Sequence, residues 1–197
     1  NLFISYELYF RINGKIYLII SKKSLNTVKT FKLPKNLEIL IEENFSELSD
    51  DGYKNQMYLK LIAYRYVSST WFWIIDSDFI FTNFIYFNTF FKKNKPLWFY
   101  SDWTSTSKKI FKKYSDKFLG INSTSNFLTD KPLFIFNKNL VEKLDKQYNF
   151  KNLLTYKGNL SEFHIYGQYC YHNFKSFFRW INTNNFNPQE YPGIYIN

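Results

Sequence analysis

The sequence is short of the residues that form disulfides and tight turns. Its 197 residues include one cysteine, Cys170, with two histidines, 6 glycines and 5 prolines. A single cysteine excludes an internal disulfide and favours a reducing compartment. The scarcity of glycine and proline excludes a collagen-like or linker-rich chain.

Arginine is also scarce, although the chain is basic. The arginines are Arg11, Arg65 and Arg179, so the net charge of +10 comes almost wholly from lysine. Proteins that read bases or phosphates through bidentate contacts rely on arginine, and we therefore expect no nucleic-acid partner. The abundance of Lys, Asn, Ile, Phe and Tyr fits the coding bias of an AT-rich genome. A basic surface still attracts anionic ligands and is compatible with peripheral contact with a membrane.

The sequence predicts neither a signal peptide nor a transmembrane span. The start of the chain lacks the charged region, apolar core and cleavage site of a signal peptide. The most apolar window, residues 71–91, contains Asp76 and Asp78, and each would be costly in lipid. We expect a cytoplasmic protein, or one at the inner face of a membrane. Because the chain begins at Asn1 rather than Met, we also expect an upstream segment.

What is present indicates a folded α/β protein. Hydrophobic residues make up 45% and aromatic residues 23% of the chain, and its length fits a single domain over residues 1–197. Apolar runs predict strands at 15–21, 37–42, 71–75, 96–100, 132–136 and 177–181. Helices are predicted at 24–31, 52–67, 79–91, 103–118, 138–148 and 160–173. This alternation predicts a mixed, mainly parallel central sheet flanked by helices.

One stretch carries most of the chemistry. The run 71–75 contains only aromatic and β-branched residues, as a strand buried on both faces does, and it is followed by Asp76 and Asp78. In an extended backbone these two carboxylates project to the same side, about 7 Å apart at Cα. A divalent cation relieves their repulsion, which predicts a metal-assisted phosphate site. The alternative is that Asp78 caps the helix predicted at 79–91.

Two further segments allow two interpretations each. Lysines in the segment 108–114 form a basic amphipathic helix that either lies on an anionic surface or packs on the core with a solvated outer face. Ser161 is the expected N-cap of the last helix, and Glu162 lies in its first turn. Glu162 is therefore either a positioned carboxylate or an acid that favours the helix dipole.

Three pieces together resemble GT-A-type glycosyltransferases, in particular small bacterial and viral ones. They are the helix segment 52–61, the strand with Asp76-Ser77-Asp78, and the segment 161–167 that begins the last helix. The resemblance covers residues 15–171 and implies a GT-A-like, Rossmann-like fold. It also implies transfer of a sugar from a nucleotide-sugar donor to a glycan, lipid-linked or protein acceptor.

The resemblance assigns roles to particular residues. Asp78 would hold Mn²⁺ or Mg²⁺ on the donor diphosphate, and Asp76 would contact either the donor ribose or the metal through water. Gln56 and Lys60 would hold the nucleotide-sugar. Glu162 would be the base of an inverting reaction or an orienting group in a retaining one. Tyr166 and Trp103 are the candidate acceptor contacts. Many members complete the metal site with a C-terminal histidine, whereas both histidines here, His164 and His172, lie on the Glu162 helix.

Two other functions fit the same residues. A metal-dependent phosphodiesterase or nuclease would use Asp76, Asp78 and Glu162 as ligands, with lysines along the phosphates. A binding module would keep the nucleotide-sugar site without turnover.

Overall fold

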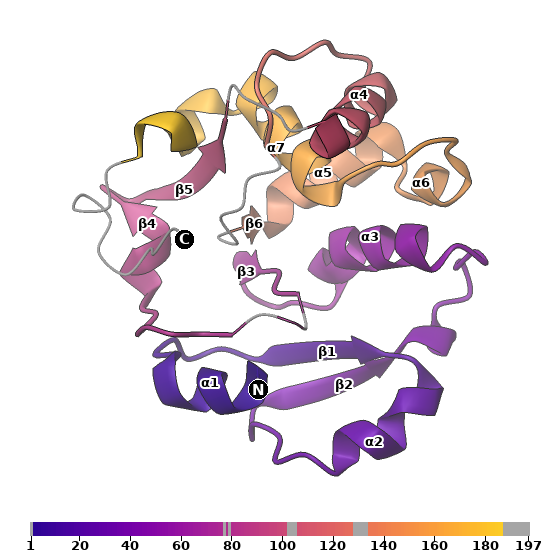
Figure 1. Cartoon of the computed structure of the whole chain (residues 1–197), viewed down its shortest axis with the longest axis vertical. Coiled ribbons are helices and arrows are strands. Elements are labelled where there is room, and N and C mark those ends of the chain that lie inside the picture. Colours follow the sequence, from indigo (N-terminus) through magenta and orange to yellow (C-terminus); the bar gives the residue numbers. More distant parts are fainter. Residues whose placement is uncertain (1, 77, 79, 102–105, 128–133, 187–197) are drawn as a thin grey trace. The chain divides into compact units, whose positions relative to one another are not determined.

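The computed structural model describes residues 2–76, 78, 80–101, 106–127 and 134–186 (Figure 1). The chain divides into two compact units, and it passes from one to the other three times. Unit 1 comprises Asn1–Leu48 and Asp76–Thr89, and unit 2 comprises Ser49–Ile75 and Phe90–Asn197.

Unit 1 is built on a small parallel sheet. Its helices and strands are α1 (Leu2–Tyr9), β1 (Ile16–Ile20), α2 (Leu25–Lys29) and β2 (Leu37–Ile41). The apolar strands β1 and β2 pair in parallel from Ile16 opposite Leu37 to Ile20 opposite Ile41, and α2 lies in the crossover (Figure 1). Every residue of both strands is half-buried.

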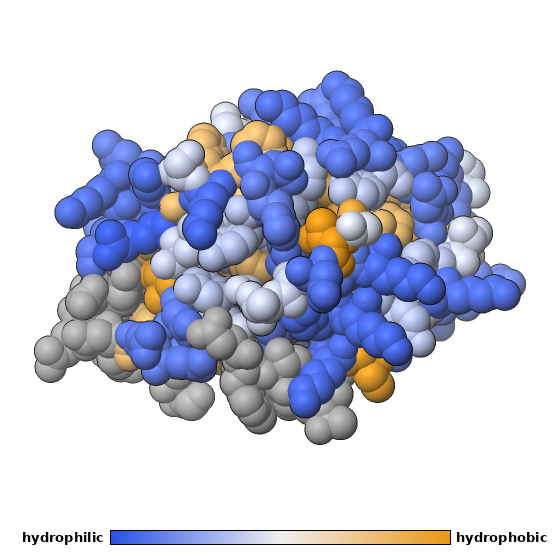
Figure 2. Space-filling view, turned by 90° about the horizontal axis from the view of Figure 1, so that it is seen from above, coloured by the Kyte–Doolittle hydropathy of each residue, from blue (hydrophilic) through white to orange (hydrophobic). Residues whose placement is uncertain are grey.

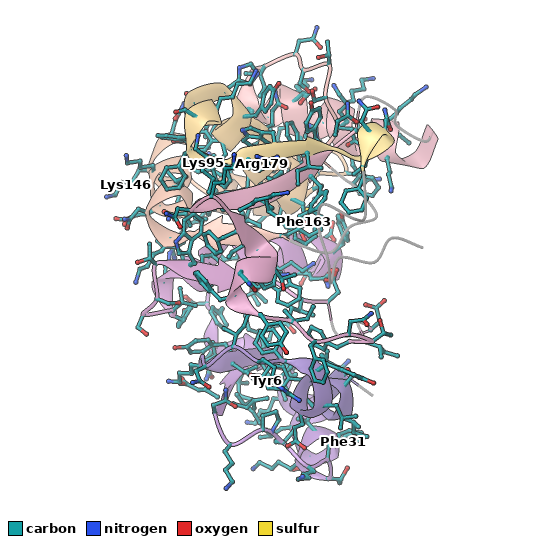
Figure 3. The ribbon with its side chains drawn as sticks, turned by 90° about the vertical axis from the view of Figure 1, so that its left-hand side faces the viewer. Tyr6, Phe31, Lys95, Lys146, Phe163 and Arg179 are labelled. Carbon is teal, nitrogen blue, oxygen red and sulfur yellow. The ribbon has the colours of Figure 1, made fainter. Side chains whose placement is uncertain are left out.

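The segment 80–89 returns to unit 1 and completes its core. The Phe81 amide donates to the hydroxyl of Ser5 on α1, at 3.1 Å. Ile85 pairs with the end of α1, since its amide donates to Tyr9 and its carbonyl accepts from the amide of Arg11. Tyr6, labelled in Figure 3, contacts Phe81 edge-on at 6.3 Å between ring centroids. Residues more than 70 positions apart thus form one core.

Unit 2 contains the remaining helices and two small sheets. Its elements are α3 (Gly52–Ile62), β3 (Trp71–Trp73), β4 (Phe91–Lys92), β5 (Lys95–Tyr100), α4 (Thr106–Leu119), β6 (Ile135–Asn137), α5 (Lys138–Tyr148), α6 (Lys151–Thr155), α7 (Glu162–Asn173) and β7 (Arg179–Asn182). Strand β3 runs antiparallel to β6. Strand β5 lies between β4, which is antiparallel to it, and β7, which is parallel to it.

Helix α7 is the centre of unit 2, because residues 161–170 are all buried. Tyr166 packs against Phe136 and Trp98, with ring centroids 4.4 and 5.1 Å apart. Phe163 stacks on Phe134 at 3.9 Å and lies in this aromatic core (Figure 3). Gly167 allows the close packing, since a Cβ there would lie 2.8 Å from atoms of Phe127 and Trp98.

The chain is a mixed α/β protein, and most predicted elements are confirmed with shifted ends. The described residues form three small sheets rather than one central sheet, and two of the four strand pairings are antiparallel. The strand before the aspartates ends at Trp73 and has an antiparallel neighbour. Within the described ranges, none of the helices combines the length and apolar character needed to cross a membrane.

The aromatic helix predicted at 79–91 is wrong. Residues 80–86 are not helical, and only a 3-10 turn occurs, at Phe87–Phe90. The backbone of Ile85 bonds to the end of α1 instead, so tertiary pairing overrides the apolar pattern of this segment.

Candidate active site

Helix α3 positions two of the predicted donor-binding residues. It begins after Asp51, whose carboxylate caps the helix by accepting from the amides of Tyr53 and Lys54 at 3.1 and 3.2 Å. Its apolar residues, among them Met57 and Leu61, are buried. This leaves Gln56 exposed and Lys60 half-buried, four residues apart on one face of the helix.

The first turn of α7 is fixed from two sides. Ser161 is its N-cap, as predicted, and its hydroxyl accepts from the amide of His164 at 3.3 Å. From α3, the hydroxyl of Tyr53 donates to the carbonyl of Leu160 at 2.9 Å. From α4, the hydroxyl of Ser115 accepts from the amide of Ser161 at 3.0 Å. Glu162, the next residue, therefore stands at a rigid helix start.

Lys60 and Glu162 meet, although they are 102 positions apart. The Lys60 Nζ lies 2.8 Å from Glu162 Oε1, and the side chains are only 16% and 5% exposed. The same ammonium lies 4.9 Å from the ring centroid of Phe163. A carboxylate this buried needs a paired cation, and the positive end of the α7 dipole adds to its stabilisation.

A second buried network lies behind the first turn of α7. The amide of Phe127 donates to Nδ1 of His164 at 3.2 Å, so this ring nitrogen is unprotonated. The proton is therefore on Nε2, which donates to Asp116 Oδ1 at 2.8 Å. Lys112 donates to the other carboxylate oxygen at 2.7 Å, and the hydroxyl of Ser123 donates to the same carboxylate. Both nitrogens of His164 are thus occupied, and the side chain is a packed residue rather than a metal ligand.

Burial and hydrogen bonds set the charges in this network. Burial would raise the pKa of the Asp116 carboxyl, but the hydrogen bonds from His164 and Lys112 hold it below its usual range. Burial lowers the pKa of the His164 imidazole, against the raising effect of Asp116. His164 is therefore neutral and Asp116 ionised near neutral pH.

The two aspartates belong to unit 1, whereas Gln56, Lys60 and Glu162 belong to unit 2. Asp76 and Asp78 are both exposed, and Ser77 between them lies outside the described residues. Because residues 80–86 are not helical, Asp78 does not cap a helix there. In the described part of the chain, no three His, Cys, Asp or Glu side chains are grouped to hold a metal ion.

The structure also places one of the two predicted acceptor contacts. Tyr166 is fully buried, and its hydroxyl accepts from the amide of Asn137 at 2.9 Å. This burial raises the pKa of the Tyr166 hydroxyl well above its ordinary value. The described surroundings of Tyr166 are core residues, so we give it a packing role. Trp103 lies outside the described residues.

Sequence reasoning missed Tyr53, Ser115 and Asp116, which hold the helices around Glu162. Asp116 gave one signal, because it is the single acid in a helix with five lysines. Tyr53 and Ser115 gave none, because their role depends on which helices pack together. Comparison with protein-family models, curated proteins and solved structures found no match to this chain.

Proposed function

We propose that the protein is a metal-dependent glycosyltransferase that moves a sugar from a nucleotide-sugar donor to a glycan, lipid-linked or protein acceptor. Three motif segments support this proposal: the segment with Gln56 and Lys60, the segment with Asp76 and Asp78, and the start of α7 with Glu162. Their order and spacing resemble those of GT-A-type enzymes.

The observation that carries the proposal is the pairing of Lys60 with Glu162. These residues come from two of the three segments, and their charged atoms lie 2.8 Å apart in a largely buried position. A buried ion pair contributes little to stability, because desolvation of both charges offsets their attraction. The pair therefore needs a reason other than stability, and a positioned carboxylate that can accept a proton supplies one.

Glu162 would act on the acceptor. Among the described residues its carboxylate is bonded through Oε1 to Lys60, and none of them is bonded to Oε2. In an inverting transfer, Oε2 would take the proton of the acceptor hydroxyl as its oxygen bonds to the anomeric carbon and the bond from that carbon to the nucleotide phosphate breaks. In a retaining transfer, Glu162 would orient that hydroxyl. The anomeric configuration of the product distinguishes the two.

Lys60 would act on the donor. An ammonium close to a donor phosphate would stabilise the negative charge that develops on the leaving nucleotide. Its ion pair with Glu162 also fixes the position of that carboxylate. Gln56, exposed on the same face of α3, would bind the nucleotide-sugar beside it.

The proposed metal is Mn²⁺ or Mg²⁺, which would be held by Asp76 and Asp78. Both carboxylates are exposed and supply the hard oxygen ligands that these ions prefer. Mg²⁺ commonly takes only one or two protein carboxylates and completes its shell with water and phosphate oxygens, so two aspartates suffice. The metal would supply positive charge to the departing diphosphate.

The test is turnover of nucleotide-sugars with and without Mn²⁺. We expect metal-dependent transfer or release of sugar, abolished by Asp78→Ala and lowered by Glu162→Gln. Asp50→Asn, which changes an exposed acid outside the site, is the matched control and should leave turnover unchanged. Full activity in excess chelator would exclude the metal role. The absence of both binding and turnover across donors would overturn the proposal.

The same assays separate the other two functions. Cleavage of a phosphodiester, with strong and salt-sensitive binding of nucleic acid, would indicate the phosphodiesterase or nuclease. Binding of a nucleotide-sugar without release of free sugar would indicate the binding module. A thermal-shift screen of nucleotide-sugars with and without Mn²⁺ detects binding in each case.

A further inference from the structure

Helix α4 presents an exposed row of lysines. Lys109, Lys113 and Lys117 are all exposed and recur every four residues, which places them along one side of the helix. Ile110 lies beside this row and is 47% exposed. The exposed side of α4 therefore combines three cations with one apolar side chain, and we call these four residues the lysine face.

The opposite side of α4 explains why the helix is stable in unit 2. Ser115, Asp116 and Leu119 are buried there. Asp116 is the only acid in the helix, and Lys112, Ser123 and His164 already bind its carboxylate. It is therefore not available to neutralise the lysine face.

Lys117 in the last turn suits the helix dipole, but helix stability does not account for the rest of the lysine face. Like charges four residues apart destabilise a helix, and the row contains two such pairs. Lys146 on α5 gives a contrast, because it pairs with Glu142 four residues earlier at 2.7 Å. The surface of unit 2 that carries α4 is largely hydrophilic (Figure 2).

We propose that the lysine face docks on the surface of an anionic phospholipid bilayer. Lysines near such a surface are attracted by its negative potential, and an apolar side chain among them can enter the boundary between headgroups and acyl chains. Nucleic acid fits this face less well, since its cations are all lysines, which lack the bidentate contacts that arginine makes with phosphates and bases. Membrane docking does not depend on the proposed glycosyl transfer. A lipid-linked acceptor would nevertheless give the enzyme a reason to bind a membrane.

The test compares binding to vesicles of phosphatidylcholine with and without phosphatidylserine. We expect the full chain to float with the anionic vesicles only and to be released as salt is raised. Each lysine contributes roughly fivefold to such binding, so Lys109→Gln/Lys113→Gln/Lys117→Gln should bind roughly a hundredfold more weakly. Ile110→Ser should weaken binding without changing its salt dependence.

The control is a second variant with the same loss of charge. Lys23→Gln/Lys29→Gln/Lys35→Gln removes three exposed lysines from unit 1 and should bind about as tightly as the unaltered chain. Circular dichroism of both variants checks that they fold. Equal loss in the two variants would overturn the proposal in favour of net charge alone. It would also be overturned if the unaltered chain did not bind anionic vesicles. Tighter binding to single-stranded nucleic acid than to these vesicles, through the same lysines, would overturn it too.

Discussion

Lys60 and Glu162 together bury two charges that neither residue could bury alone, since their side chains are 16% and 5% exposed. The energetic consequence differs from that of a surface pair. On the same helix, Lys54 approaches Asp51 at 3.3 Å, but the Asp51 side chain is 46% exposed. The two pairs therefore allow the effect of burial to be measured within one helix.

Lys60→Met should lower the free energy of unfolding by about 3–5 kcal/mol, because the Glu162 carboxylate is left buried without a cation. Lys54→Met should cost less than about 0.5 kcal/mol, as exposed pairs do. Urea unfolding of the two variants measures both. Similar costs would show that Glu162 is less buried in solution than its 5% exposure indicates.

His164 should make stability depend on pH. Burial lowers the pKa of its imidazole in the folded protein below the ordinary value of about 6.5. As the pH drops, this histidine therefore binds a proton in the unfolded chain before it does so in the folded protein. Stability should fall as the pH drops below about 6.5 and should level off below the pKa of the folded state. Thermal unfolding across this range measures the slope.

The exposed His172 supplies the matched variant for this measurement, since the chain has two histidines. His172→Gln should leave the slope of stability against pH unchanged. His164→Gln should flatten this slope and lower the stability itself. At lower pH, protonation of Asp116 should remove further stability, because the pKa of its carboxyl is lowered in the fold. An unchanged slope in His164→Gln would contradict the assignment.

At the scale of elements, α7 and α3 show opposite uses of glycine. Gly167 lies within α7 against Phe127 and Trp98, whereas a Cβ at Gly52, at the start of α3, would meet nothing within 4 Å. Helices usually prefer alanine to glycine. Packing opposes this preference at Gly167 in α7 but not at Gly52 in α3.

Gly167→Ala should destabilise the protein by about 1–3 kcal/mol, because the added methyl overlaps two packed side chains. Gly52→Ala should stabilise it by about 0.5 kcal/mol through the lower entropy of the unfolded chain. Denaturant unfolding with both variants checks the two signs. A gain in stability for Gly167→Ala would show that Phe127 and Trp98 can move away from α7.

Local patterns predicted most elements but not their partners. Helix α5 was predicted at 138–148, where it occurs, because its amphipathic spacing and its flanking residues are local signals. The segment 80–86 was predicted as helix and is not, because Ile85 bonds to residues more than 70 positions away. The antiparallel pairing of β3 with β6 could not be predicted either, since an apolar run does not specify the direction of the neighbouring strand.

The candidate site was predictable only in part, for the same reason. The family resemblance selected Lys60 and Glu162, and the structure brings them together at 2.8 Å. The residues that support Glu162 were missed, because Ser115 and Asp116 act across a contact between helices. Tyr166 was selected by its place in the motif, yet its fully buried position depends on the packing of three aromatic neighbours.

At the scale of the whole molecule, each unit contains a buried serine whose hydroxyl bonds to the backbone of a distant segment. In unit 1, Ser5 accepts from the amide of Phe81, and in unit 2, Ser115 accepts from the amide of Ser161. Both hydroxyls join segments that are far apart in the sequence. Their removal therefore probes how independently the two units unfold.

Ser5→Ala should remove the buried hydrogen bond to the Phe81 amide, at a cost of about 1–3 kcal/mol. We expect faster amide hydrogen exchange within unit 1 and little change in α7. Ser115→Ala should have the reverse effect, with faster exchange in α7 and little change in β1 and β2. If either variant accelerated exchange equally in both units, the chain would unfold as one cooperative body.

The return of the segment 76–89 to unit 1 has a consequence for synthesis on the ribosome. Domains generally fold from the N-terminus as they emerge, but the first 48 residues lack Phe81 and Ile85, which are buried in the core of unit 1. Tyr6 and Phe10, which pack on Phe81, must stay uncovered while the first part of unit 2 is translated. During this interval the nascent chain is a natural client for a chaperone that binds extended apolar segments.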